Sequence, residues 1–149
     1  MIKKLNHTNS SIANKIRAVF QASYAIEAKL LNAVDFPPLQ RSLEDFIKSD
    51  TAFFGVFKNG ELAGVIEVAT TARSTHIQSL VVDPQFFRQG IAQSLLEFAL
   101  NTYDSTLFTV ETGLENEPVT QLYQKFGFKA IKQWDTDHGV RKIRLKKRI

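Results

Sequence analysis

The 149-residue chain contains no cysteine, which excludes disulfide bonds, thiolate metal ligands and a cysteine nucleophile. It has no apolar run that approaches the ~20 residues of a membrane span, and its first ten residues lack the apolar segment of a signal peptide. We therefore expect a cytoplasmic protein that binds neither a membrane nor a metal ion. The length is typical of one domain with a sizeable core, so residues 1–149 are predicted to form a single domain.

Acidic residues are missing from the last twelve positions, 138–149, although this segment holds six of the nineteen basic residues. The remainder carries 13 basic and 15 acidic residues, so the net charge of +4 is a property of the C-terminal segment. Ile143 and Leu145 alternate there with charged residues, which is typical of a solvated edge strand whose lysines discourage sheet-to-sheet pairing. Polyanion binding is the alternative, but we expect no nucleic-acid partner.

Strand-like and helix-like segments follow one another along the chain and predict a mixed-sheet α/β fold with helices on its faces, in the order β-α-α-β-β-β-α-β-α-β-β. Asn59-Gly60 is the strongest short hairpin signal, and Pro37 and Pro38 end the first helical pattern. The expected strands are Ile2–Leu5, Thr51–Phe57, Leu62–Val68, Ile77–Val82, Leu107–Val110, Phe128–Trp134 and Val140–Leu145. The expected helices are one that runs from Ile12 and stops near Asp35, then Leu39–Ile47, Gln89–Tyr103 and Pro118–Phe126.

The segment from Leu80 to Leu100 carries the most specific signal. An apolar strand ends at Asp83-Pro84, a short polar turn follows, and Gly90 precedes an amphipathic helix. Gly90 has no Cβ where the backbone must approach a ligand, Arg88 adds a cation, and the helix N-terminus offers unpaired N–H groups at the positive end of its dipole. This arrangement suits a diphosphate, although a glycine before a helix can also be only a turn.

Two common phosphate sites are excluded by the same segment. It contains no G-x-G-x-x-G fingerprint, and no β-α-β unit opens the chain, so a Rossmann dinucleotide site is not expected. It also lacks the final Gly-Lys-Ser/Thr of a P-loop, and with it the lysine and hydroxyl that hold the β- and γ-phosphates and magnesium.

Two segments in the right order and spacing resemble the GNAT superfamily of acyl-CoA-dependent N-acetyltransferases. The first, VVDPQFFRQGIAQSLL, is similar to the family's Q/R-x-x-G-x-G/A pyrophosphate loop. Gly90 and Ala92 match its last two fixed positions, and Phe87 departs from it by standing where the pattern has Gln or Arg.

The second segment, ENEPVTQLYQKFGF, is similar to the family's N-x6-Y-x3-GF signature, with Asn116, Tyr123, Gly127 and Phe128 in place. The order of elements agrees with the family over nearly the whole chain. The resemblance implies a mostly antiparallel central sheet and acetyl-CoA as the cosubstrate.

The resemblance also implies how acetyl-CoA is held. The strand before the loop would splay from its neighbour, and the backbone of Leu80, Val81 and Val82 would bind the pantetheine arm like an added strand. Asn116 would hydrogen-bond the same arm, although an N-cap of the following helix needs the same side chain. Backbone N–H groups would wrap the pyrophosphate, from Arg88, Gln89, Gly90, Ile91, Ala92 and Gln93.

Tyr123 is implied as the general acid, because a phenol can donate a proton to the CoA sulfur that leaves on direct transfer. Without the motif, a tyrosine on a short apolar helix face would be interpreted as a core residue. The attacking amine needs a base, since an alkylamine with a pKa of about 10.4 is mostly protonated at neutral pH. Glu111, at the end of its strand, is the first candidate, followed by Glu67 and then His76. The alternative for each is a solvent-facing strand residue.

By the same resemblance, the acceptor binds between the first two helices and the final hairpin. Tyr24, Glu27, Asp35 and Phe36 come from the first region, and Trp134 and His138 come from the second. An acidic and aromatic lining favours a cationic amine, although residues 35–38 can equally form a rigid loop without a ligand.

The leading hypothesis is an N-acetyltransferase that transfers acetyl from acetyl-CoA to a primary amine by direct attack, without a metal or a covalent intermediate. A non-catalytic acyl-CoA-binding sensor is the alternative, and a nucleic-acid-binding protein is a third hypothesis. The intact Tyr123 favours the enzyme, since a sensor needs no proton donor there. The acceptor, the acyl-chain preference and the oligomeric state stay open, and a homodimer is compatible with the sequence.

Overall fold

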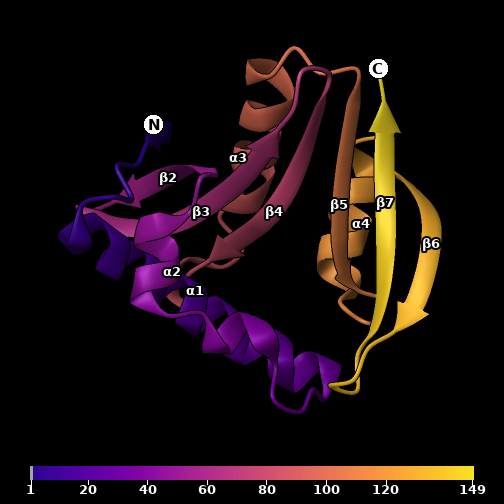
Figure 1. Cartoon of the computed structure of the whole chain (residues 1–149), viewed down its shortest axis with the longest axis horizontal. Coiled ribbons are helices and arrows are strands. Elements are labelled where there is room, and N and C mark those ends of the chain that lie inside the picture. The colour runs from indigo at the N-terminus through magenta and orange to yellow at the C-terminus, as the bar shows by residue number, and fades with distance from the viewer. Residues whose placement is uncertain (1) are drawn as a thin grey trace.

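One sheet of seven strands, in the order β1-β2-β3-β4-β5-β7-β6, runs through the computed structural model, which describes residues 2–149 (Figure 1). Within these residues β4 and β5 run parallel, and every other neighbouring pair is antiparallel. The predicted element order and the mixed, mostly antiparallel sheet flanked by helices are confirmed.

The strands are β1 (Ile2–Lys4), β2 (Ala52–Lys58), β3 (Glu61–Thr70), β4 (Ser74–Val82), β5 (Leu107–Gly113), β6 (Lys129–Asp135) and β7 (Arg141–Arg148). The helices are α1 (Ser10–Leu31), α2 (Leu43–Lys48), α3 (Ile91–Thr102) and α4 (Glu117–Lys125), with short 3-10 turns at η1 (Pro37–Gln40) and η2 (Pro84–Phe86).

Strands β2 and β3 are buried on both faces. Successive side chains of a strand point to opposite faces, so Phe53 and Val65 pack with α1 and α2, whereas Phe54 and Ile66 pack with α3. None of these four side chains is more than 8% exposed. The near-continuous apolar run of β3, ELAGVIEVAT, follows from this cover on two sides.

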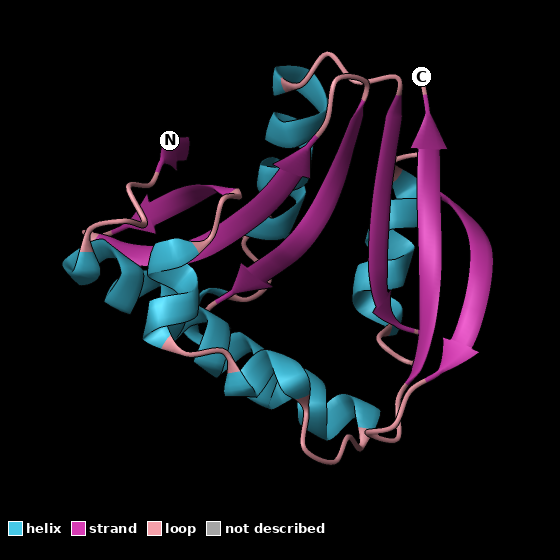
Figure 2. Ribbon diagram, in the orientation of Figure 1, coloured by secondary structure: helices cyan, strands magenta, loops and turns pink. Residues whose placement is uncertain are grey.

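Strands β5, β7 and β6 have helical cover on one face. Ile143 and Leu145 of β7 belong to the same apolar cluster as Tyr123 of α4 and the nearby Phe128. No helix within the described part of the chain covers the opposite face (Figure 2). Strand β6 forms the edge of the sheet, and all of its residues except the half-buried Trp134 are exposed.

The basic C-terminal segment is an inner strand, and the prediction of an edge strand is wrong. Strand β7 pairs with β5 from Lys142 to Arg148 on one side and with β6 from Arg141 to Lys146 on the other. Its backbone N–H and C=O groups are therefore paired on both sides, and its apolar residues Ile143 and Leu145 face the core. Lysines on this strand cannot act as edge protection.

The predicted helix over Leu39–Ile47 is wrong in its first half. Pro37–Gln40 forms a 3-10 turn, Arg41 is extended, and α2 starts only after Ser42. The Asp45 N–H donates to the Ser42 hydroxyl, and the Ser42 N–H donates to the Asp45 carboxylate. This capping box supplies a new helix start after the turn.

The parallel strands β4 and β5 separate part of the way along their length. Their pairing stops at Ile77 and Val110. Gln78 is an extra residue in the ladder with β3, because Ser79 and Ile77 face consecutive residues of that strand. Such a bulge bends and twists its strand. Beyond it, β4 and β5 diverge into an open V, and α1 crosses the wide end of this V (Figure 1).

Candidate active site

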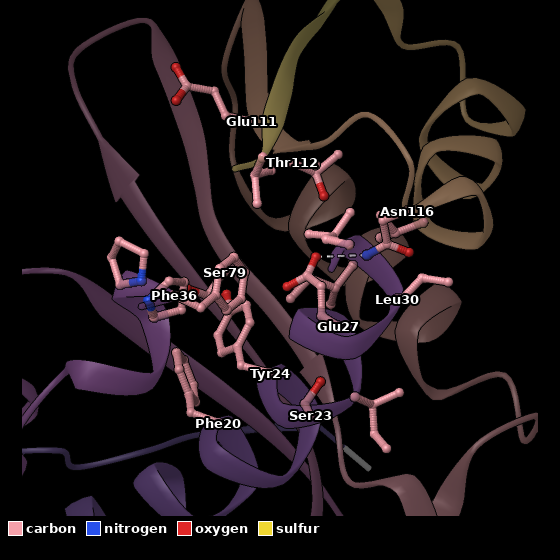
Figure 3. A pocket seen from close by; sticks show the side chains of 18 of the residues that line it. Phe20, Ser23, Tyr24, Glu27, Leu30, Phe36, Ser79, Glu111, Thr112 and Asn116 are labelled. Carbon is pink, nitrogen blue, oxygen red and sulfur yellow. Dashed lines mark hydrogen bonds between the residues drawn. The ribbon is translucent and has the colours of Figure 1, made fainter. Parts of the chain in front are cut away.

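A cavity of about 890 Å³ occupies the V between β4 and β5. Its walls come from α1, η1, the separated parts of β4 and β5, the start of α4 and the loop before β7. Figure 3 shows Tyr24, Glu27, Ser79 and Asn116 close to its centre, and Tyr123 also lines it. Residues from opposite ends of the chain therefore meet in one space.

The wide end of the V is closed where the end of α1 meets the loop between β6 and β7. The Val34 N–H donates to the His138 carbonyl at 2.9 Å. The ring of Phe36 lies between those of His138 and Tyr24, at 5.9 Å from each measured between centroids. These contacts join the N-terminal and C-terminal parts of the fold across the cavity.

Most residues that the sequence assigned to the acceptor region do line the cavity, namely Tyr24, Glu27, Phe36 and His138. Asp35 and Trp134 are not among the lining residues. Asp35 has a left-handed backbone, with φ of 50°, in the connection between α1 and η1. Pro37 and Pro38 contribute to the wall, so residues 35–38 form a loop that is rigid and also faces the cavity.

Tyr123 is a buried residue of α4, with 2% of its surface exposed. Its ring packs at 5.3 Å against Phe128 of the same motif. Burial raises the pKa of the Tyr123 phenol, and the nearby Tyr24 phenol and Glu27 carboxylate raise it further. Among residues 2–149, none forms a hydrogen bond with its hydroxyl. The phenol is thus protonated at neutral pH and free to interact with a ligand.

Glu27 and Asn116 form a hydrogen bond across the cavity, in which Asn116 Nδ2 donates to Glu27 Oε1 at 2.7 Å (Figure 3). Asn116 occupies the N-cap position of α4, but its side chain does not cap the helix. Burial raises the pKa of Glu27, while the hydrogen bond from Asn116, the charge of Lys142 and a hydrogen bond from Thr112 lower it. The pair ties α1 to the β5–α4 connection.

Glu111 lies inside β5, which continues to Gly113 beyond the predicted end of this strand. It lines the cavity, and its Oε2 accepts a hydrogen bond from Arg144 Nη1 at 2.5 Å. His76 bonds through Nδ1 to the Thr109 hydroxyl at 2.7 Å but is not a lining residue. Burial lowers the pKa of His76, and the charge of Glu111 opposes this shift.

Glu67 is held away from the cavity in a buried ion pair. Its carboxylate accepts hydrogen bonds from Arg41 Nη1 at 2.7 Å and Nη2 at 3.0 Å, and from the Thr51 hydroxyl at 2.7 Å. The Arg41 guanidinium also stacks 4.1 Å from the centre of the Phe46 ring. Arg41 lines the cavity and Glu67 does not.

The glycine-marked turn lies at the end of β4, next to the cavity. Leu80 lines the wall and Val81 packs with α1. Arg88 and Gly90 have φ values of 64° and 74°, so two left-handed residues precede the start of α3 at Ile91. A Cβ on Gly90 would meet no atom within 4 Å. Backbone conformation, and not space within the chain, therefore favours glycine here.

The remaining residues of the turn lie at different depths. Phe87 and Arg88 line the cavity, and Phe87 is 44% exposed. Gln93 accepts a hydrogen bond from Lys125 Nζ at 3.1 Å, which joins the first turn of α3 to the last turn of α4. Seven predicted binding residues lie outside the cavity lining, and they are Val81 and Val82 of β4 and, around the start of α3, Gln89, Gly90, Ile91, Ala92 and Gln93.

Four cavity residues carry no signal in the sequence: Arg41, Ser79, Thr112 and Lys142. The Ser79 hydroxyl interacts with the Tyr24 phenol, whose pKa is raised by burial and by Glu27. No local pattern identifies these residues, because each lies on a different element. They come together only through strand pairing and the path of α1.

The described residues 2–149 contain no group of three or more histidine, aspartate or glutamate side chains placed to hold a metal ion. Across the same residues, no helix has the length and apolar character needed to cross a membrane.

Comparison with known proteins identifies the family of this chain. Residues 26–149 match the model of the acetyltransferase (GNAT) domain. The UPF0157 protein YqkA of Bacillus subtilis is 35% identical over 141 residues, which cover 94% of this chain and 41% of the relative. The chain therefore spans about two fifths of that relative's length. Streptothricin acetyltransferase of Escherichia coli is 30% identical over 119 residues, or 76% of this chain and 68% of the relative.

The fold also matches that of solved structures. PaiA N-acetyltransferase from Thermoplasma acidophilum, solved in complex with coenzyme A, superposes with a TM-score of 0.77 at 19% identity and covers 100% of this chain and 98% of its own. At this identity the likeness concerns the fold. The family-model match covers most of the sequence and includes both motifs, and on that ground the chain belongs to the GNAT acetyltransferase family.

Proposed function

We propose that the chain is an N-acetyltransferase that transfers acetyl from acetyl-CoA to a primary amine by direct attack, with Tyr123 as the general acid. The observation that carries the proposal is the position of Tyr123, a buried and protonated phenol on the cavity between the separated strands β4 and β5. The similarity to a streptothricin acetyltransferase and to a fold solved with coenzyme A supports the proposal.

The residues around the V fit acetyl-CoA. From Gln78 to Val82, β4 does not pair with β5, and backbone groups left without a partner strand favour an amide-bearing ligand such as the pantetheine arm. The first N–H groups of α3 lack partners within the helix, and with Gly90 and the Arg88 cation they suit the two phosphates. Asn116 uses Nδ2 for Glu27, which leaves its Oδ1 to accept from the arm. Acetyl-CoA supplies the activated acetyl group as a thioester.

Tyr123 would donate a hydrogen bond, and then its proton, to the sulfur that leaves. Its raised pKa keeps the phenol protonated before the reaction. The Tyr24 phenol and the Glu27 carboxylate disfavour the ionised form of Tyr123. They would help it to regain a proton after each turnover.

Glu111 is the base that we favour. Arg144 holds Oε2 of its carboxylate, which orients the group and leaves Oε1 to take a proton from the amine directly or through water. His76 is a second candidate because burial keeps its ring neutral near physiological pH. Glu67 is less suited, since its carboxylate already accepts three hydrogen bonds, two of them from Arg41.

The test is a Tyr123→Phe variant, assayed for release of free CoA from acetyl-CoA with a panel of amines. Phenylalanine keeps the packing with Phe128 and removes the proton donor, so we expect turnover to fall by roughly 100- to 10,000-fold. Affinity for CoA, measured by calorimetry, should stay unchanged. Tyr103→Phe is the matched control, because Tyr103 at the end of α3 does not line the cavity.

Unchanged turnover in Tyr123→Phe would reject Tyr123 as the acid. Wild-type protein that binds CoA but releases none with any amine would reject the enzyme in favour of an acyl-CoA-binding sensor.

A further inference from the structure

The open face of β7 and β6 is strongly basic. Directly opposed residues of neighbouring strands point to the same face, and Arg144, which opposes Glu111 and Lys132, alternates with the buried Ile143 and Leu145. We name the cations that share this side the basic face. Its members are Lys129 and Lys132 of β6 and Lys142, Arg144, Lys146 and Arg148 of β7.

Within the basic face, two cations of β6 each lie directly opposite a cation of β7. Lys129 faces Lys146, and Lys132 faces Arg144, an arrangement that destabilises a sheet. Edge protection accounts for the two lysines of β6. It does not account for the cations of β7, since that strand is paired on both sides. Arg144 pairs with Glu111, but among residues 2–149 no salt bridge joins Lys142, Lys146 or Arg148 to a carboxylate. The placement of these three cations therefore points to an anionic ligand.

The basic face begins at the cavity. Lys142 lines the cavity, and Arg144, Lys146 and Arg148 follow along the same side of β7. Side chains two residues apart on a strand are about 7 Å apart. Alternate side chains of an extended polypeptide have the same spacing, so a strand-like ligand can present one acidic group to each cation.

Charge changes sign between the cavity and the basic face. Inside the cavity, the carboxyl groups of Glu27 and Glu111 suit an ammonium ion, whereas the cations outside suit carboxylates. A ligand with a cationic amine at its end and acidic groups behind it complements both. Polyamines are cationic throughout and would be repelled by the basic face.

Nucleic acids complement the basic face but not the cavity. Their amino groups are conjugated with aromatic rings and are weak nucleophiles, whereas a polypeptide offers an aliphatic N-terminal or lysine amine. A cavity that acetylates amines next to a basic surface therefore favours a polypeptide over a nucleic acid.

We propose that the basic face is the docking surface for the acceptor, and that the acceptor is a polypeptide with acidic residues next to the amine that enters the cavity. This inference rests on the proposed function and narrows its substrate class. The acidic segment extends along β7, and electrostatic attraction raises its rate of association.

The test compares Lys132→Glu/Lys146→Glu with the control Lys15→Glu/Lys58→Glu. Both double variants change the net charge equally, and the control lysines are exposed on α1 and at the end of β2. In the first variant each new glutamate opposes a cation, Arg144 or Lys129. We therefore expect the variant to fold, and a thermal melt checks this.

Steady-state kinetics with acetyl-CoA would use three peptides, in which the N-terminal residue is followed by glutamates, glutamines or lysines. We expect wild type to have the highest kcat/KM for the glutamate peptide, and this preference should shrink as salt rises from about 50 to about 500 mM. Lys132→Glu/Lys146→Glu should lose on the order of tenfold more kcat/KM for the glutamate peptide than for the glutamine peptide. Any effect of the new glutamate at position 132 on Arg144, and through it on Glu111, is common to both peptides. Equal kcat/KM for all three peptides, or an equal loss in the control variant, would overturn the inference.

A binding measurement separates this inference from the proposed function. Fluorescence anisotropy follows the glutamate peptide with its N-terminus already acetylated, so that no transfer can occur. Salt-sensitive binding that needs Lys132 and Lys146, in a protein that acetylates no amine, would support the docking surface and reject the enzyme. Acetylation of uncharged amines without such binding would reject the docking surface alone. A single-stranded RNA that binds more tightly than the peptide would reject the polypeptide as its occupant.

Discussion

The two halves of the sheet share one hydrogen-bonded ladder but use their faces differently. In β2 and β3, helices cover both faces, and seven consecutive residues of β3 are buried. In β7, buried residues alternate with half-exposed cations, because α4 covers one face and the other is open. The cavity lies at the boundary between these halves. The first half supplies a rigid wall, and the second supplies charged groups that remain accessible.

Each half contains one arginine–glutamate pair that illustrates this difference. Arg41 and Glu67 form a bidentate pair whose side chains are 22% and 1% exposed. Arg144 and Glu111 share a single contact and are 35% and 30% exposed. The same two residue types thus make a structural pair in one half and a solvent-accessible pair in the other.

The largest expected effect is in the first half, from Glu67→Ala. Removing the buried carboxylate leaves Arg41 without its partner and Thr51 without its acceptor, so we expect the free energy of unfolding to fall by about 3–5 kcal/mol. Urea denaturation measures it. The control is Glu44→Ala, which removes an exposed pair with Lys48 on α2 and should change stability little. A loss in Glu67→Ala no larger than in the control would contradict the structural role of the buried pair.

A smaller effect on stability is expected in the second half, from Glu111→Gln. The pair with Arg144 is partly exposed, so the free energy of unfolding should change by less than about 1 kcal/mol. Turnover should nevertheless fall strongly if Glu111 is the base, while Glu67→Ala should retain turnover at temperatures where it is folded. Assays of CoA release and urea denaturation, run in parallel on both variants, would measure the change in turnover and the change in stability. Full turnover in Glu111→Gln would move the base to His76 or to water.

The smallest effect, and one of opposite sign, is expected where α1 joins the halves, from Glu27→Gln. Burial raises the pKa of Glu27 above its ordinary 4.5, so the folded protein binds this proton more tightly than the unfolded chain. Stability therefore falls as pH rises from about 4.5 through the folded-state pKa. Glutamine removes this cost, and its side-chain oxygen can still accept from Asn116. We expect the variant to melt slightly above wild type near pH 7.

The difference between Glu27→Gln and wild type should vanish below about pH 4, where the carboxyl is protonated in both states. Melting temperatures across the pH range test this, with the exposed Glu115→Gln as the control. A destabilised Glu27→Gln at neutral pH would mean that the charge of Glu27 strengthens the contact with Asn116 more than its burial costs.

Local signals in the sequence led to correct predictions of structure. Asn59 and Gly60 form the predicted turn, with φ values of 51° and 80°, because such a turn depends on two adjacent residues. Gly90 precedes α3 as predicted, for the same reason. The predicted helix over Leu39–Ile47 starts too early, because apolar spacing does not mark where a helix begins, whereas the capping box of Ser42 and Asp45 does.

Strand order was harder to predict, and with it the role of the basic segment. The alternation in RKIRLKKR is the same for an edge strand and for an inner strand with one open face. Pairing of β7 with β5 joins residues more than thirty positions apart, such as Glu111 and Arg144. A pattern within one strand carries no information on its neighbours, so the basic face could not be inferred from it.

Element types, the glycine-marked turn and the two family motifs were readable in the chain alone, because each depends on residues a few positions apart. The set of residues that line the cavity could not be predicted from the chain alone. Asn116 forms a hydrogen bond with Glu27, which lies 89 positions away in the sequence. Glu67 and Glu111 are both strand carboxylates in the sequence, but Glu67 forms a buried ion pair with Arg41. Such contacts depend on how strands pair and how α1 crosses the V, and these are settled by packing over long separations. The fold therefore decided which carboxylates face a ligand and which only hold the structure together.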